Sequence, residues 1–214
     1  MSPSTNPTPM TPGDIFRSQQ FHHADNRPGL LFREDWVESD AAMPITQAHV
    51  AHPELLLATY GPGKEWLKKS NHALPLSDPF YAYTGFCKLP AALTLRHRTQ
   101  FADLTGYTKI RWRTKQTHFH RLHVLLKLAD GSWLISEKSI GSSEDWQESE
   151  FSLFGLVWHR FDPAIIVVYP PVPNPDLSRV DEIGFTDLMV GTGKADAGGS
   201  RVDWIEVHGR PVPR

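Results

Sequence analysis

The sequence predicts an all-β protein, an antiparallel β-sandwich of the jelly-roll type with a few short helices. Short segments with alternating apolar and polar residues recur along the chain, and clusters of Gly, Pro, Asn and Asp separate them. Helical periods between these segments, which a parallel α/β sheet requires, are scarce. The predicted strands span residues 92–98, 109–115, 118–128, 132–137, 164–169, 182–187 and 201–208.

The expected helices are short. Residues 46–52 form the first, because Thr46 can cap its N-terminus and Pro53 ends it. Residues 65–69 form the second. Neither is long enough to build a helical layer, so both are expected to lie in connections of the sandwich.

The length of 214 residues suits one sandwich domain, which we place at residues 29–210. Residues 1–28, which begin with a Ser-, Thr- and Pro-rich stretch, are expected to form a flexible leader. This stretch lacks the basic start and apolar run of a secretory signal, so a cytoplasmic location is the default expectation.

Composition excludes several partners. The 22 Lys and Arg nearly balance the 24 Asp and Glu, so a generic nucleic-acid partner is not expected. The apolar runs are too short to span a bilayer, so no membrane partner is expected either. Cys87 is the only cysteine, which excludes a disulfide framework and a thiolate metal cage.

Residues 109–137 are expected to form a long hairpin with one apolar and one basic side. In its first two strands, alternate residues are apolar and point toward the core. These core residues are Ile110, Trp112, Leu122, Val124, Leu126 and Leu128, and Thr114 shares the side of Ile110 and Trp112. The residues between them share the other side, which we call the basic side, and they include Arg111, Arg113, His123 and Lys127.

The basic side has two interpretations. Like charges that face each other across strands destabilise a sheet, so these cations need anionic neighbours, a concave wet surface or an anionic ligand. The alternative is an ordinary solvated outer face, because basic residues there also protect strand edges from aggregation.

Four segments together resemble a known fold family. They are FADLTGYTKIRWR at 101–113, DLSRVDEIGF at 176–185, SRVDWIEV at 200–207 and LLFREDW at 30–36. The first three resemble strands of galactose-binding-like β-sandwiches, which include carbohydrate-binding modules and domains of the complex I intermediate-associated protein 30 type. The fourth resembles the first strand of that fold and also the opening strand of keto-disaccharide hydrolases.

The resemblance implies a carbohydrate or small-molecule ligand, and it implies a structural Ca²⁺ between acids of the first and last strands. The matching acids here are Glu34, Asp35, Asp203 and Glu206. Ca²⁺ requires six or more oxygen ligands, and the alternative for these residues is ordinary surface acids. Residues 53–90 have no counterpart in the family pattern, so we expect a functional loop region there.

Acid–base chemistry could be supplied by five residues. They are His123 as general base, Tyr83 as partner acid, and Arg111, Arg113 and Lys127 as cations that stabilise a developing enolate. One alternative is a two-carboxylate glycosidase that uses Glu137 and Asp187. Another is a transition-metal site at His118 and His120, which are two positions apart and would share one side of an extended strand.

Aromatic residues could hold a sugar, because the C–H face of a pyranose buries apolar area against a ring. The candidate substrate-binding residues are Trp66, His72, Tyr81 and Trp133.

These patterns predict a carbohydrate-active protein that binds a sugar or acidic sugar on the basic side. The concentration of His and Arg there favours an enzyme, a glycan lyase or glycoside hydrolase. The alternatives are a non-catalytic carbohydrate-binding or protein-assembly domain and a small-molecule cyclase or isomerase.

Overall fold

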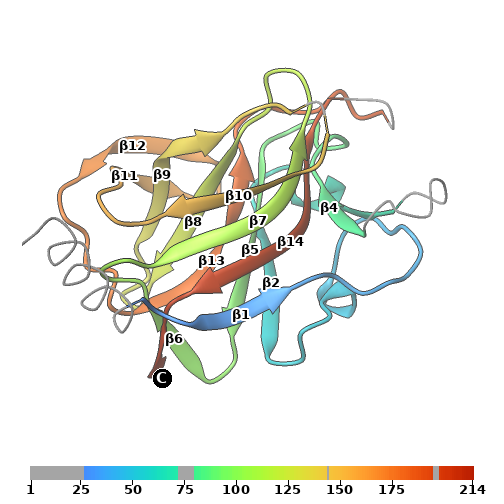
Figure 1. Ribbon diagram of the computed structural model, residues 1–214. Helices are drawn as coiled ribbons and strands as arrows, with labels where there is room; N and C mark the ends of the chain where they lie inside the picture. The colour runs from blue at the N-terminus through green and yellow to red at the C-terminus, as the bar shows by residue number, and fades with distance from the viewer. Residues whose placement is uncertain (1–26, 72–79, 144, 195–197) are drawn as a thin grey trace, which may run out of the picture.

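The computed structural model describes residues 27–71, 80–143, 145–194 and 198–214, which form two antiparallel sheets packed face to face (Figure 1). The predicted all-β sandwich is therefore confirmed. Most of the predicted leader and the predicted ligand residue His72 lie outside the described residues. No helix within the described ranges is both long and apolar enough to cross a membrane.

The described residues of sheet A form six strands in the order β10-β7-β14-β4-β3, with β1 beside β14. Its strands are β1 (Leu30–Glu34), β3 (Lys68–Ser70), β4 (Tyr81–Tyr83), β7 (Lys109–Gln116), β10 (Gln147–Ser152) and β14 (Ser200–His208). Strand β14 is central, because β7 pairs with one of its edges while β4 and β1 share the other.

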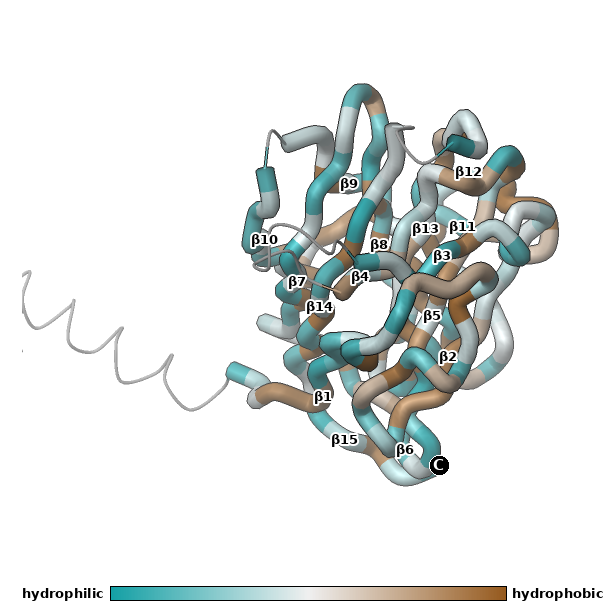
Figure 2. Tube along the Cα trace, turned by 90° about the vertical axis from the view of Figure 1, so that its right-hand side faces the viewer, coloured by the Kyte–Doolittle hydropathy of each residue, from teal (hydrophilic) through white to brown (hydrophobic). Residues whose placement is uncertain are grey.

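Sheet B has nine strands within the described ranges, seven of them in the order β12-β11-β9-β8-β13-β5-β2. These are β2 (Leu55–Tyr60), β5 (Ala91–His97), β8 (Leu122–Leu128), β9 (Trp133–Ile140), β11 (Trp158–Asp162), β12 (Val167–Val172) and β13 (Val180–Asp187). Strand β6 (Gln100–Asp103) pairs with β13 and with β15 (Arg210–Pro213). Seen edge-on, β7 and β14 lie in one layer and β13, β5 and β2 in the other (Figure 2).

The core lies between the two sheets, as the alternation predicts. Ile110 and Trp112 of β7 meet Leu122, Val124 and Leu126 of β8 in one cluster, and all five are fully buried. Leu128, at the end of β8, is partly buried against the same cluster. Burying each such aliphatic side chain stabilises the fold by about 1.5–3 kcal/mol.

The predicted hairpin is wrong in its first half. Strand β7 pairs with β10 and β14, whereas β8 pairs with β9 and β13 in the other sheet. Residues 117–121 carry the chain from sheet A to sheet B, so the strand predicted at 118–128 begins only at Leu122. The second half is confirmed, since β8 and β9 pair around the Asp130–Gly131 turn.

The short helices are smaller than expected. A 3-10 turn, η1 (Gln47–His49), replaces the helix at 46–52, and a second, η2 (Lys64–Trp66), overlaps the helix at 65–69. The end of that second segment is strand β3, because Lys68–Ser70 pairs with β4 at the edge of sheet A.

Candidate ligand-binding site

The predicted basic side does not exist as one surface. Each sheet turns its apolar side to the shared core, so Arg111 and Arg113 of β7 and His123 and Lys127 of β8 point away from the sandwich in opposite directions. Alternation along a strand identifies its two sides but not its partner strand, which is the physical reason for the error.

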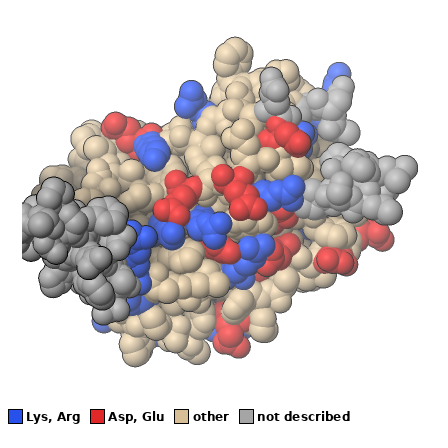
Figure 3. All heavy atoms as spheres, in the orientation of Figure 1, with Lys and Arg blue, Asp and Glu red and all other residues tan. Residues whose placement is uncertain are grey.

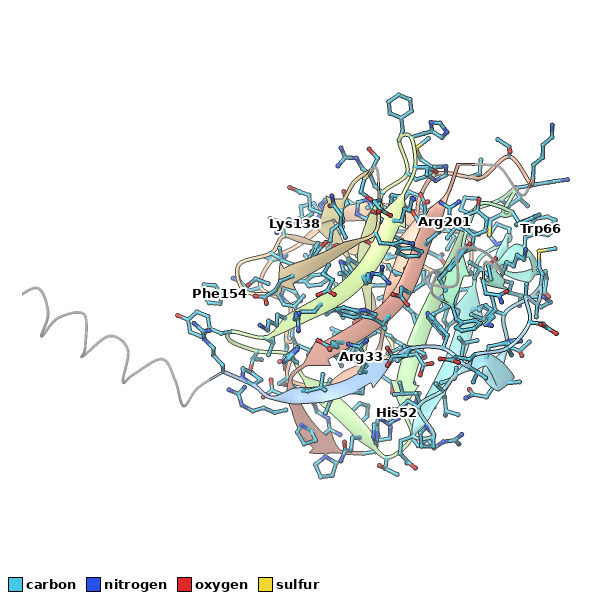
Figure 4. All side chains as sticks on the ribbon, turned by 45° about the vertical axis from the view of Figure 1, so that its right-hand side comes forward. Arg33, His52, Trp66, Lys138, Phe154 and Arg201 are labelled. Atoms are coloured by element: carbon cyan, nitrogen blue, oxygen red, sulfur yellow. The ribbon has the colours of Figure 1, made fainter. Side chains whose placement is uncertain are left out.

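The predicted site residues therefore separate into groups. Sheet A carries Tyr81, Tyr83, Arg111, Arg113, Asp203 and Glu206, and sheet B carries His123, Lys127 and Trp133. Trp66 belongs to neither group, because it lies on η2, partly buried against the main core. Figure 4 shows it at the margin of the molecule, apart from Arg201 on β14.

Carboxylates neutralise most cations on the outer face of sheet A. Strand β10 and strand β14 flank β7 and place acids beside its basic residues. The ion pairs are Lys109–Glu150 at 2.6 Å, Arg111–Glu206 at 3.0 Å, Arg113–Asp203 at 2.7 Å, Arg33–Glu206 at 2.7 Å and Lys115–Asp145 at 3.6 Å. Figure 3 shows the result as an interleaved band of basic and acidic side chains. Most cations on this face therefore have anionic neighbours, which is the first of the three arrangements expected for them.

One end of this face carries aromatic rings instead. The rings of Tyr81 and Trp146 lie 5.4 Å apart, those of Tyr81 and Tyr83 6.2 Å, and those of Tyr83 and Phe86 6.0 Å, all in edge-to-face arrangements. Tyr81 and Tyr83 are 2% and 3% exposed, whereas Phe86 and Trp146 are half-buried and reach the surface.

Cations lie over these rings. The Arg201 guanidinium carbon is 4.6 Å from the centroid of the Tyr83 ring, and the Arg113 carbon is 5.2 Å from that of Trp146. The Lys68 Nζ is 4.8 Å from the centroid of the Phe86 ring. We call the whole group the aromatic–cation cluster, and its members are Lys68, Tyr81, Tyr83, Phe86, Arg113, Trp146 and Arg201.

The backbone approaches the cluster closely at two glycines. A Cβ on Gly85 would lie 2.0 Å from the Tyr83 hydroxyl, and one on Gly199 would lie 2.6 Å from the backbone of Gly85. Both positions therefore require glycine to hold the chain against the buried Tyr83 ring.

Sequence reasoning found three members of the cluster, Tyr81, Tyr83 and Arg113, and missed the other four. Lys68 lies in the segment 65–69 that the sequence predicts as a helix, and Trp146 precedes strand β10, which the sequence does not predict. Arg201 begins a strand that was predicted, and its alternation with Val202 places it on the outer side. That alternation was a usable signal for Arg201, but no pattern showed which strands would lie beside it.

The outer face of sheet B carries a separate polar network around Glu182, which is 4% exposed. Its carboxylate accepts hydrogen bonds from the Tyr60 hydroxyl at 2.7 Å, the Thr94 hydroxyl at 2.6 Å and the Lys127 ammonium at 2.8 Å. Burial, and then the bond to Glu182, raise the pKa of Tyr60. The Tyr60 ring also packs edge-to-face on Trp133, with centroids 4.8 Å apart.

Lys127 and Trp133 are thus brought together, with the Lys127 Nζ 5.6 Å from the Trp133 ring. His123 lies on the same face, and its Nδ1 is 2.8 Å from the carbonyl oxygen of Ser136. Burial lowers the pKa of His123 below its usual value near 6.5.

The four acids of the predicted calcium site have other partners. Glu34 is buried and accepts backbone N–H bonds from Trp36 at 2.9 Å, Ala51 at 2.7 Å and His52 at 3.0 Å. Desolvation raises its pKa, against those three hydrogen bonds. Asp35 pairs with Arg33, while Asp203 and Glu206 belong to the ion pairs above. Among the described side chains, no group of three or more His, Cys, Asp and Glu could hold a metal ion, and the calcium site stays a prediction.

Three of the alternative site residues, His120, Asp187 and Glu137, also have partners within the protein. The Nδ1 of His120 lies 2.6 Å from the Asp187 carboxylate, which also accepts a hydrogen bond from the Ser200 hydroxyl at 2.7 Å. His120, Asp187 and Ser200 are all buried. Glu137, the predicted partner of Asp187 in a two-carboxylate glycosidase, is exposed and contacts His159.

Comparison with known proteins gave structural neighbours only. The chain matches no family model, and no curated protein matches it. It is similar to a family 11 carbohydrate-binding module of a Clostridium thermocellum cellulosomal cellulase, with a TM-score of 0.44, 15% identity, and coverage of 81% of this chain and 97% of that one. A family 11 module from the same organism in complex with a β-1,3-1,4-mixed-linked tetrasaccharide has a TM-score of 0.44 and 14% identity, over 80% of this chain and 98% of that one. A family 29 carbohydrate-binding module has a TM-score of 0.39 and 13% identity, over 80% of this chain and 86% of that one.

Proposed function

We propose that the protein binds a carbohydrate through the aromatic–cation cluster on sheet A. The observation that carries this proposal is the pair of half-buried rings, Trp146 and Phe86, set among the cations Arg113, Arg201 and Lys68. A pyranose can bury its C–H face on such a ring, while guanidinium and ammonium groups donate hydrogen bonds to its oxygens. Ligand sites commonly combine these two elements, an apolar surface and a few fixed polar groups.

Binding without cleavage fits the arrangement better than an acid–base enzyme. The general base expected at His123 lies on sheet B, whereas Tyr83, Arg111 and Arg113 lie on sheet A. A base must come within about 3 Å of the proton that it removes, directly or through one water. The core separates these residues, so they cannot act on one substrate, and we propose a binding protein.

The test is affinity for a panel of soluble oligosaccharides, measured by isothermal titration calorimetry with the wild type and two aromatic variants. Trp146→Ala removes a ring of the cluster, and Phe154→Ala removes a 63% exposed ring in the connection between β10 and β11, outside the cluster. We expect Trp146→Ala to weaken binding by about tenfold or more, which is about 1.4 kcal/mol, and Phe154→Ala to leave it unchanged. Equal affinities of the wild type and Trp146→Ala for every bound glycan would contradict the proposal.

A further inference from the structure

A row of three cations and one ring crosses sheet A at the aromatic–cation cluster. Lys68 of β3 is opposite Tyr83 of β4, Tyr83 is opposite Arg201 of β14, and Arg201 is opposite Lys115 of β7. Residues that face each other across antiparallel strands point to the same side of the sheet, about 4.5–5.5 Å apart at Cβ. The register therefore gathers the positive charges of Lys68, Arg201 and Lys115 on one outer surface.

This row is poorly neutralised, unlike the rest of the face. Within the part of the chain that the structure describes, neither Lys68 nor Arg201 forms an ion pair, and their cation contacts are with rings. Lys115 is 3.6 Å from Asp145, whose side chain is 85% exposed, so water screens that pair. The other cations of the face have carboxylate partners at 2.6–3.0 Å.

Arg201 also has an unsatisfied hydrogen-bond donor. Its Nη1 is buried and has no hydrogen-bond acceptor among the described residues. A ring face attracts the charge of a guanidinium but does not provide the oxygen acceptors that its N–H groups require. Leaving a buried donor without an acceptor costs about 1–3 kcal/mol, and more when the group is charged.

We propose that the Lys68–Arg201–Lys115 row binds the anionic group of an acidic carbohydrate, a uronate carboxylate or a sugar sulfate. This inference rests on the proposed function, since the sugar ring would lie on the neighbouring rings of Trp146 and Phe86. Arg201 is the group best suited to the anion, because the planar fork of arginine donates two parallel hydrogen bonds to a carboxylate or sulfate. Lys68 and Lys115 add charge from either side.

The experiment compares three ligands that differ in charge: a trigalacturonate, the uncharged galactotriose of the same linkage, and inorganic sulfate. Binding of the two saccharides is measured by calorimetry at two salt concentrations, and sulfate binding is measured as a shift in Tm. The variants are Arg201→Gln, Arg201→Lys, and Arg111→Gln as the matched control, because Arg111 lies on the same face but is paired with Glu206. The Tm of each variant without ligand shows whether it folds.

We expect the trigalacturonate to bind at least tenfold more tightly than the galactotriose, with an affinity that falls as salt is raised. Arg201→Gln is expected to bind the trigalacturonate about ten- to a hundredfold more weakly than the wild type and to bind the galactotriose with nearly unchanged affinity. Arg201→Lys should retain part of the affinity, and Arg111→Gln nearly all of it. If Arg201→Gln fails to fold, the Arg201→Lys comparison and the salt dependence of the wild type decide the outcome.

The possible failures are distinguishable. Equal affinity for the charged and neutral saccharides, unaffected by Arg201→Gln or by salt, would overturn the anionic specificity and leave carbohydrate binding intact. Binding of sulfate that requires Arg201, without binding of either saccharide, would overturn carbohydrate binding for these ligands and retain the anion site. Absence of binding to all three would overturn the anion site itself.

Discussion

The network around Glu182 on sheet B is expected to stabilise the fold rather than bind the ligand. Glu182→Ala removes the acceptor of three hydrogen bonds, which are donated by the hydroxyls of Tyr60 and Thr94 and by the Lys127 ammonium. Thr94 is fully buried, and each unsatisfied buried hydroxyl costs about 1–3 kcal/mol. Lys127 also loses its nearer carboxylate, but Asp181 lies 3.9 Å from its Nζ and its side chain is 27% exposed, so the loss is partly compensated.

The expected loss in the free energy of unfolding is therefore about 3–5 kcal/mol for Glu182→Ala, in the range measured when one partner of a buried pair is removed. Glu182→Gln keeps the shape and one oxygen acceptor, so it should lose less, about 1–3 kcal/mol. Glu137→Ala is the control, because Glu137 is exposed and its contact with His159 is worth about 0–1 kcal/mol.

The assay is urea unfolding followed by tryptophan fluorescence, together with carbohydrate affinity of the folded variants. A loss below about 1 kcal/mol for Glu182→Ala would refute the stability argument. Unchanged stability with abolished glycan binding in Glu182→Gln would move the ligand site to sheet B and contradict the choice of sheet A.

Three further predictions concern the sandwich itself. Gly184→Ala should destabilise the fold by about 1–3 kcal/mol or more in urea unfolding, because its Cβ would lie 2.0 Å from the carbonyl oxygen of Leu93 on the adjacent strand. Leu126→Ala should cost about 2–5 kcal/mol in the same assay, and the partly buried Leu128→Ala should cost less; equal losses would contradict the assigned core. The lowered pKa of His123 means that its contribution to stability is present above the unfolded pKa near 6.5 and is lost as the pH falls through the folded value. His123→Gln should therefore weaken the fall in stability between pH 7 and pH 5, and an unchanged pH profile would show that the burial of His123 has no such effect.

The sequence predicted the inward and outward sides of β7 and β8 but not that these two strands belong to different sheets. Ile110, Trp112, Leu122, Val124 and Leu126 are all core residues, because hydrophobic burial acts on each strand separately and leaves a period of two. Pairing depends on contacts between residues far apart in the chain. The five-residue connection after β7 can close a hairpin or cross to the other sheet, and its composition does not distinguish these outcomes.

The candidate site illustrates the same limit. The sequence predicts site roles for three members of the aromatic–cation cluster, Tyr81, Tyr83 and Arg113. The acid–base hypothesis, however, combines Tyr83 and Arg113 with His123 and Lys127, which lie across the core. The basic residues of β7 lie on an outer side, as predicted, but the acids that pair with them are 30 to 95 positions away in the sequence. Whether a cation is neutralised or free to bind an anion is therefore decided by register.

Strand β14 shows how register separates a charge-balanced surface from a charged one. Its C-terminal half pairs with β1 and places Glu206 between Arg33 and Arg111, so each cation has a carboxylate beside it. Its N-terminal half pairs with the short β4, which offers the ring of Tyr83 and no acid opposite Arg201. A ring lowers the electrostatic cost of a nearby cation without neutralising it. The exchange of β1 for β4 along one edge of β14 therefore confines the uncompensated charge to one end of sheet A, next to rings that a sugar could cover.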